Sequence, residues 1–96
     1  MIRSFGNRLA EDLYDDRRTS AVRRLPPQLY AAARRKILFL HDAGEIGDLR
    51  VPPGNRLEAL KGDVAGYHSI RINDQCRVVF RWIDGHAHDV KVVDYH

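Results

Sequence analysis

The chain has 96 residues, of which 44% are hydrophobic and 30% are charged, and its formal net charge is +3. This length builds one core, so we expect one domain over residues 1–96, and no run of about 20 apolar residues predicts a membrane span. The N-terminal residues lack the apolar core of a signal peptide, and Cys76 is the single cysteine, so we expect no internal disulfide and a reduced, cytoplasmic setting.

Arginine carries most of the positive charge, with 13 arginines against 3 lysines. Cations gather in the first half of the chain, at positions 17–18, 23–24 and 34–36. Because guanidinium groups bind phosphate oxygens in pairs, this preference favours a phosphate-rich partner. A solvated arginine-rich surface without such a partner accounts for the composition equally well.

The first half of the chain predicts mainly helices. Residues 1–5 alternate weakly and predict a short strand, and Asn7 is placed to cap a helix that runs to about residue 15. Residues 16–25 are polar and basic without a clear period, which predicts a linker. A proline pair then begins a helix over residues 26–43, whose apolar stripe is formed by Leu29, Ala33, Ile37 and Leu40.

From Asn55 onward the pattern alternates with a period of two, which is typical of strands. Four strands are predicted, over residues 56–60, 66–73, 76–83 and 86–95. Asp84-Gly85 predicts a tight hairpin, because glycine readily adopts the positive φ that such turns need. Two helices followed by antiparallel strands predict an α+β fold, with both helices on one face of a twisted antiparallel sheet.

The alternation separates two faces of the predicted sheet. The inward face is apolar and consists of Ile70, Ile72, Val78, Phe80, Trp82, Val90 and Val92. The outward face gathers cations and polar groups on adjacent strands, namely Arg71, Arg77, Arg81, Lys91, Ser69 and Asn73, with Asp89 as the main counter-charge. Like charges on neighbouring strands repel each other, and an anionic partner would remove that penalty. We therefore predict that this face binds RNA, although polar outer faces are common in antiparallel sheets.

The final residues, Asp94, Tyr95 and His96, combine two proton-transfer groups with an aromatic ring at the end of a predicted strand. RNA cleavage through its own 2′-hydroxyl needs a base, an acid for the departing 5′-oxygen and cations for the phosphorane. Asp94 and His96 can transfer protons, and Tyr95 can stack on a base. Lys61 can hold charge, and Glu58 adds a carboxylate. Taken singly, each residue also has a plain structural explanation, such as a strand end or a turn.

The residues predict neither a metal site nor a cofactor. His86 and His88 lie on one face of the last strand, but no third ligand stands at a fixed spacing from them. The alternation also places Tyr95 on the cationic face, whereas Asp94 and His96 have the opposite parity. The end of the chain must therefore twist if all three side chains are to meet one phosphate.

Several motifs resemble those of HigB-type toxins, the killer proteins of bacterial type II toxin–antitoxin pairs in the RelE/ParE superfamily. The likeness is specific from residue 51 to the end of the chain and looser before it. It rests on Pro52–Gly62, Ser69–Asn73, Arg77–Phe80 and Val93–His96.

The resemblance implies a small RelE-like α+β toxin that enters the ribosomal A site and cuts mRNA there. It also implies inhibition by a HigA-type helix-turn-helix antitoxin, and contact with operator DNA only through the toxin–antitoxin complex. In the family, roles in activity belong to motif positions that fall here on Asp94, Tyr95, His96, Lys61 and Arg77.

Two positions depart from the family's pattern. Glu58 stands where well-studied members have a histidine, so either Glu58 or His96 is a candidate base; Cys76 replaces an aromatic residue. Two other functions stay open at this point. One is a ParE-like inhibitor of DNA gyrase, against which the closing Asp94–His96 argues, and the other is a catalytically decayed RNA- or protein-binding module, for which Glu58 would be the sign.

Overall fold

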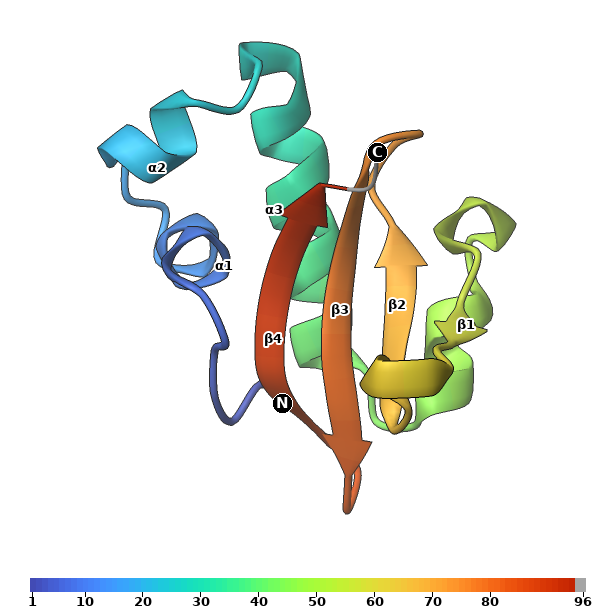
Figure 1. Ribbon diagram of the computed structural model, residues 1–96. Coiled ribbons are helices and arrows are strands. Elements are labelled where there is room, and N and C mark those ends of the chain that lie inside the picture. Colours follow the sequence, from blue (N-terminus) through green and yellow to red (C-terminus); the bar gives the residue numbers. More distant parts are fainter. Residues whose placement is uncertain (95–96) are drawn as a thin grey trace.

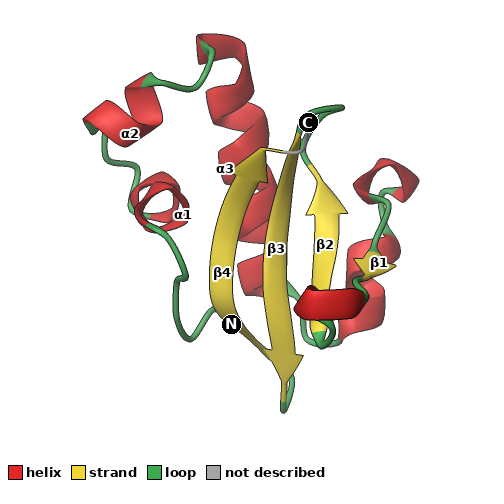
Figure 2. Ribbon diagram, viewed as in Figure 1, coloured by secondary structure: helices red, strands yellow, loops and turns green. Residues whose placement is uncertain are grey.

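The protein consists of helices packed against a four-stranded antiparallel sheet, as a computed structural model shows for residues 1–94 (Figures 1 and 2). The strands occur in the sheet in the order of the chain, β1-β2-β3-β4. Their bounds are Glu58–Ala59, Tyr67–Arg71, Cys76–Ile83 and His86–Asp94. The predicted α+β class and the antiparallel sheet are confirmed.

Two short turns join the long strands, and both depend on specific residues. At the β3–β4 hairpin, Asp84 and Gly85 have φ angles of +52° and +80°, which confirms the predicted two-residue turn. In the β2–β3 turn, the side-chain oxygen of Asn73 accepts hydrogen bonds from the backbone nitrogens of Gln75 (2.9 Å) and Cys76 (2.7 Å). Asn73 therefore shapes the turn, in addition to any contact with RNA.

The first predicted strand, over residues 56–60, is shorter than expected. Arg56 adopts a left-handed conformation with φ +46°, so pairing with β2 begins only at Glu58. Beyond Ala59, the backbone nitrogen of Leu60 still donates to the carbonyl of Tyr67 at 2.8 Å. The resulting edge strand is very short, which limits pairing with other chains.

Helices make up most of the first half, as predicted. They are α1 (Arg8–Tyr14), α2 (Ser20–Arg23) and α3 (Pro27–Asp42), followed by three 3₁₀ turns, η1 (Ile46–Arg50), η2 (Pro53–Asn55) and η3 (Gly62–Val64). Asn7 caps α1 through a 3.0 Å hydrogen bond from the backbone nitrogen of Ala10. The prediction of a linker over residues 16–25 is wrong where α2 forms, because a helix of a single turn is too short to show a hydrophobic period in the sequence. No helix within residues 1–94 is long and apolar enough to cross a membrane.

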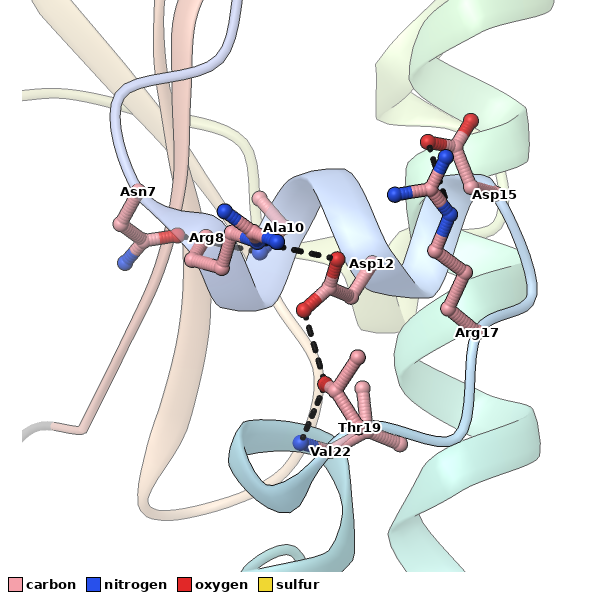
Figure 3. Close-up of polar contacts among 8 residues, drawn as sticks. All are labelled: Asn7, Arg8, Ala10, Asp12, Asp15, Arg17, Thr19 and Val22. Atoms are coloured by element: carbon pink, nitrogen blue, oxygen red, sulfur yellow. Dashed lines mark hydrogen bonds and ion pairs between the residues drawn. The ribbon is translucent and has the colours of Figure 1, made fainter.

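A buried carboxylate joins α1 to α2 (Figure 3). Asp12 is fully buried, and its Oδ2 accepts a 2.8 Å hydrogen bond from the hydroxyl of Thr19, while its Oδ1 lies 3.4 Å from Nε of Arg8. The same hydroxyl oxygen of Thr19 accepts from the backbone nitrogen of Val22 at 3.5 Å and so caps α2. One threonine therefore serves both the buried charge and the helix end.

Replacement of Thr19 by valine is expected to destabilise the protein by about 1–3 kcal/mol. Valine keeps the shape but removes both the cap of α2 and the donor to Asp12, whose buried oxygen is left unsatisfied. Urea unfolding measures the change, and Thr19→Ser, which retains the hydroxyl, is the matched control. Equal stability of the valine variant and the wild type would contradict this role.

The core lies between the helices and the inner face of the sheet, and α3 crosses behind the strands in Figure 1. It contains the predicted stripe residues Ala33, Ile37 and Leu40, and from the sheet Ile70, Ile72, Val78, Phe80, Val90 and Val92, with Trp82 packed partly against it. The extended start of the chain forms two isolated parallel bridges with β4, Ile2 to Ala87 and Phe5 to Val90. The segment 1–5 thus covers the edge of β4 without becoming a regular strand.

A β-bulge interrupts β4 at Asp89, which the alternation did not predict. Val79 pairs with Lys91, but Arg81 pairs with His88, so β4 contains one extra residue between these pairs. Asp89 has φ +54°, a conformation that aspartate tolerates better than most residues. The bulge keeps both Ala87 and Val90 buried, although they are three positions apart.

Candidate active site

Arg77 is the best-anchored cation on the outer face of the sheet. Its Nη1 donates to the Ser69 hydroxyl at 2.7 Å, and its Nη2 lies 3.3 Å from Oε1 of Glu58. The Arg77 side chain is only 11% exposed, whereas that of Glu58 is 56% exposed. The guanidinium is therefore held in place before any ligand arrives, beside a carboxylate that solvent reaches.

Strand pairing explains this geometry. Glu58 is paired with Ser69 across β1 and β2, and Ser69 is paired with Val79, the next outward residue after Arg77 on β3. Ser69, for which the sequence predicted a contact with RNA, is fully buried in the free protein. Its hydroxyl accepts the hydrogen bond from Arg77 and so positions the guanidinium.

The predicted crowding of like charges is relieved within the protein itself. Arg71 is paired directly opposite Arg77, but its guanidinium forms a short ion pair with Asp74. Lys91 lies 3.7 Å from the carboxylate of Asp89, as the sequence predicted for this counter-charge. Arg77 itself lies beside Glu58, so three cations of this face have acidic neighbours.

Arg81 and Lys61, the two other cations predicted to act on this side of the sheet, are exposed. Arg81 lies 5.7 Å from the centre of the Tyr67 ring, and the side chain of Lys61 stands just before η3, where it is exposed to solvent. In Figure 1 the gold segment that contains η3 passes in front of the sheet, on the side opposite α3. The segment that carries Lys61 therefore belongs to the same side of the molecule as Arg77.

The closing motif is described only in part. Asp94 ends β4 opposite Cys76 and is exposed. Tyr95 and His96 lie outside the described residues, so their predicted convergence with Arg77 stays a prediction. Cys76 is buried in the core, and burial, with a smaller contribution from Asp94, raises the pKa of its thiol. A thiol that holds its proton in this way packs as a small apolar group.

The histidine pair on β4 does not build a metal centre in the part of the chain described. The Nη2 atom of Arg3 lies 3.3 Å from Nε2 of His86, and burial together with Arg3 lowers the pKa of that imidazole. Within residues 1–94, no three histidine, cysteine, aspartate or glutamate side chains are grouped so as to hold a metal ion.

A buried lysine, which the sequence analysis missed, anchors the loop that leads to β1. The ammonium of Lys36 donates a short hydrogen bond to Oδ1 of Asn55. Asn55 is fully buried, and its amide donates to the carbonyls of Leu49 (3.1 Å) and Val51 (3.3 Å). A sequence signal existed, since Lys36 has the helical spacing of the apolar stripe, four residues before Leu40.

Replacement of Lys36 by methionine is expected to destabilise the protein by about 1–3 kcal/mol at neutral pH, because the buried oxygen of Asn55 loses its donor. Burial, followed by the charges of Arg35 and Arg71, lowers the pKa of Lys36. Because the pKa of Lys36 is lower in the folded state than in the unfolded chain, the free energy of unfolding of the wild type increases as pH rises from the first value towards the second. Urea unfolding from pH 7 to pH 10 should show this increment in the wild type and not in Lys36→Met. A constant difference between them would contradict it.

Comparisons with known proteins agree with this architecture. A family model described as the RelE-like toxin HigB of type II toxin–antitoxin systems matches residues 3–96. The chain is 40% identical over 87 residues to Toxin HigB-1 of Vibrio cholerae, covering 91% of this chain and 90% of that protein. It is 33% identical over 96 residues to Endoribonuclease HigB of Proteus vulgaris, covering both chains completely.

Among solved structures, the YoeB–YefM complex of Staphylococcus aureus contains a chain with a TM-score of 0.61 and 18% identity. The match covers 100% of this chain and 98% of that one. At this identity the likeness shows the fold alone, which is RelE-like. The family match spans nearly the whole sequence, and two relatives exceed 30% identity over most of their length. The chain therefore belongs to the HigB-like family of RelE-fold toxins of type II toxin–antitoxin systems.

Proposed function

We propose that the protein is an endoribonuclease toxin that cuts mRNA on the ribosome and thereby stops translation. The observation that carries this proposal is Arg77, anchored by Ser69 and Glu58 on a cationic outer sheet face. A fixed guanidinium beside an accessible carboxylate suits phosphoryl transfer, in which charge develops on phosphate oxygens. The name of the Proteus vulgaris relative, Endoribonuclease HigB, supports the same activity.

The reaction uses the substrate's own 2′-hydroxyl. A base, for which Glu58 is the candidate among the described residues, takes the hydroxyl proton while the 2′-oxygen bonds to phosphorus. The bond from phosphorus to the 5′-oxygen then breaks, and an acid protonates the departing oxygen. Asp94 and His96 are the candidates for that acid, and Tyr95 is a platform for a neighbouring base. The products are a 2′,3′-cyclic phosphate and a free 5′-hydroxyl.

Several cations have supporting roles in this proposal. Arg77 and Lys61 stabilise the charge of the phosphorane, while Arg71, Arg81 and Lys91 attract the RNA backbone. Because these contacts are few, the mRNA must be oriented by the ribosomal A site before the 2′-hydroxyl lines up with the 5′-oxygen. This is the physical reason for dependence on the ribosome.

A HigA-type antitoxin with a helix-turn-helix domain is the proposed partner, and the complex of the two would contact operator DNA. Membership in a toxin–antitoxin family supports this, and the similar S. aureus structures are themselves YoeB–YefM complexes. The substrate places the toxin in the cytoplasm, where ribosomes translate.

Mapping of mRNA 5′ ends tests the function directly. Purified protein is added to ribosomes programmed with mRNA, to the same mRNA without ribosomes, and to gyrase with relaxed plasmid. Cuts within the A-site codon, together with poor cleavage of free RNA, are the expected result. Inhibition of gyrase without cleavage would overturn the proposal in favour of a ParE-like toxin.

A further inference from the structure

A cavity of about 340 Å³ lies on the outer face of the sheet, and Asp94 and Lys91, which have roles in the proposed function, are among the residues that line it. Val79 and Val93 form its apolar floor, and Leu60, Val64 and Tyr67 line its sides. Val64 is 45% exposed, which makes it one of the few large apolar side chains left in solvent. The volume is at the lower end of the range of small-molecule sites, roughly 300–1,000 Å³.

The cavity adjoins the anchored arginine. Val93, in the floor, is paired directly with Arg77 across β3 and β4, and Val79 is the next outward residue on β3. Val79 in turn is paired with Ser69, which holds Arg77. A base that lies on this floor is therefore one residue position along the sheet from the Arg77 guanidinium. If a phosphate binds that guanidinium, the neighbouring nucleotide can place its base in the cavity.

The wall formed by Tyr67 is fixed by the bulge on β4. The hydroxyl of Tyr67 donates a short hydrogen bond to the carboxylate of Asp89, which also lies 3.7 Å from Nζ of Lys91. The bond to Asp89, with smaller effects of burial and of the Asp89 charge, raises the pKa of Tyr67. Lys91 lies 5.5 Å from the centre of the same ring. One strained residue thus holds an aromatic wall and a cation in place around the cavity.

The rim of the cavity carries two carboxylates and one ammonium group. Asp63 in η3 is exposed, Asp94 closes the end of β4, and Lys91 lines the cavity with them. Carboxylate oxygens accept hydrogen bonds and repel carbonyl oxygens. A flat, apolar ring that carries an amino group satisfies such a rim, whereas a ring with a carbonyl in the same place does not.

We propose that this cavity is a base-specificity pocket for the nucleotide next to the cut, and that Asp63 selects bases with an exocyclic amino group over uracil. This inference rests on the proposed function, since it concerns the RNA that the toxin cuts. The ring lies on Val79 and Val93 against Tyr67, its amino group donates to Asp63, and Lys91 approaches the neighbouring backbone. Cytosine and uracil form the sharpest comparison, because an amino group replaces a carbonyl on the same ring.

The test uses programmed ribosomes and a set of mRNAs that differ at one nucleotide of the A-site codon at a time. For the position that fills the pocket, wild-type kcat/KM should be about tenfold higher with cytosine than with uracil. Asp63→Asn should abolish this preference, because its amide presents a donor as well as an acceptor. Asp42→Asn, an exposed change near the end of α3, is the matched control and should retain the preference. An unchanged profile in Asp63→Asn would overturn the proposal.

A second variant tests occupancy of the cavity independently of Asp63. Val64→Trp places a large ring at the exposed mouth and should raise KM for every codon, with a smaller effect on kcat. Unchanged KM would show that no base enters. Either failure is distinguishable from failure of the proposed function, because wild-type cleavage is measured in the same reactions. A wild-type protein that cuts no mRNA overturns the proposed nuclease activity. A wild-type protein that cuts without any base preference overturns only the pocket.

Discussion

Replacement of Arg77 by alanine is expected to lower the rate of mRNA cleavage by about 100- to 1,000-fold, while the fold survives. The expected loss is that of a fixed donor that stabilises charge in the transition state. Single-turnover cleavage on programmed ribosomes measures it, with circular dichroism and urea unfolding to confirm the fold. Because the rest of the RNA-binding face remains, the loss should fall on kcat rather than KM.

Arg77→Lys separates charge from geometry. Lysine keeps the positive charge but cannot hold Ser69 and Glu58 with two nitrogens at once. We therefore expect Arg77→Lys to remain impaired by at least about tenfold, which corresponds to roughly 1.4 kcal/mol. Arg50→Ala, at an exposed arginine that ends η1, is the matched control for loss of an arginine. Full activity of Arg77→Ala would remove the central residue of the proposed site.

Much of the fold was predictable because it depends on local signals. Asn7 begins α1 at a cap, and the period-two pattern gave the antiparallel sheet and its apolar face. Asp84-Gly85 gave the hairpin, since both central residues need positive φ. The four-residue α2 was missed because a single turn shows no period, and because the hydrogen bond from Thr19 to Asp12 forms only in the folded chain.

The candidate site was predictable in its residues but not in its contacts. Alternation placed Arg77 and Ser69 on one face, yet it cannot show that Ser69 is buried beneath the guanidinium. The bulge at Asp89 also escaped prediction, because no local residue pattern marks an extra residue in a strand. That bulge brings Asp89 to Tyr67 and Lys91, so the least predictable backbone feature shapes the wall of the cavity beside Arg77.

Glu58 is the position at which this chain departs from the family's pattern, and its substitution should have the second large effect. Glu58→Gln retains size and an oxygen that can accept from Arg77, but an amide does not take up a proton. If the carboxylate is the base, the cleavage rate should fall by about 100- to 10,000-fold. The measurement is again single-turnover cleavage, and Glu11→Gln on the exposed side of α1 is the matched control.

Glu58→His then separates proton transfer from the positioning of Arg77. An imidazole can serve as a base but, when protonated, it repels the guanidinium 3.3 Å from the present carboxylate oxygen. Histidine side chains lose their proton about two pH units above carboxylic acids, so the cleavage rate of this variant relative to that of the wild type should increase with pH. We expect partial activity that rises between pH 6 and pH 8. If Glu58→Gln cuts mRNA as fast as the wild type, Glu58 is only a partner of Arg77, and the base must be sought at His96.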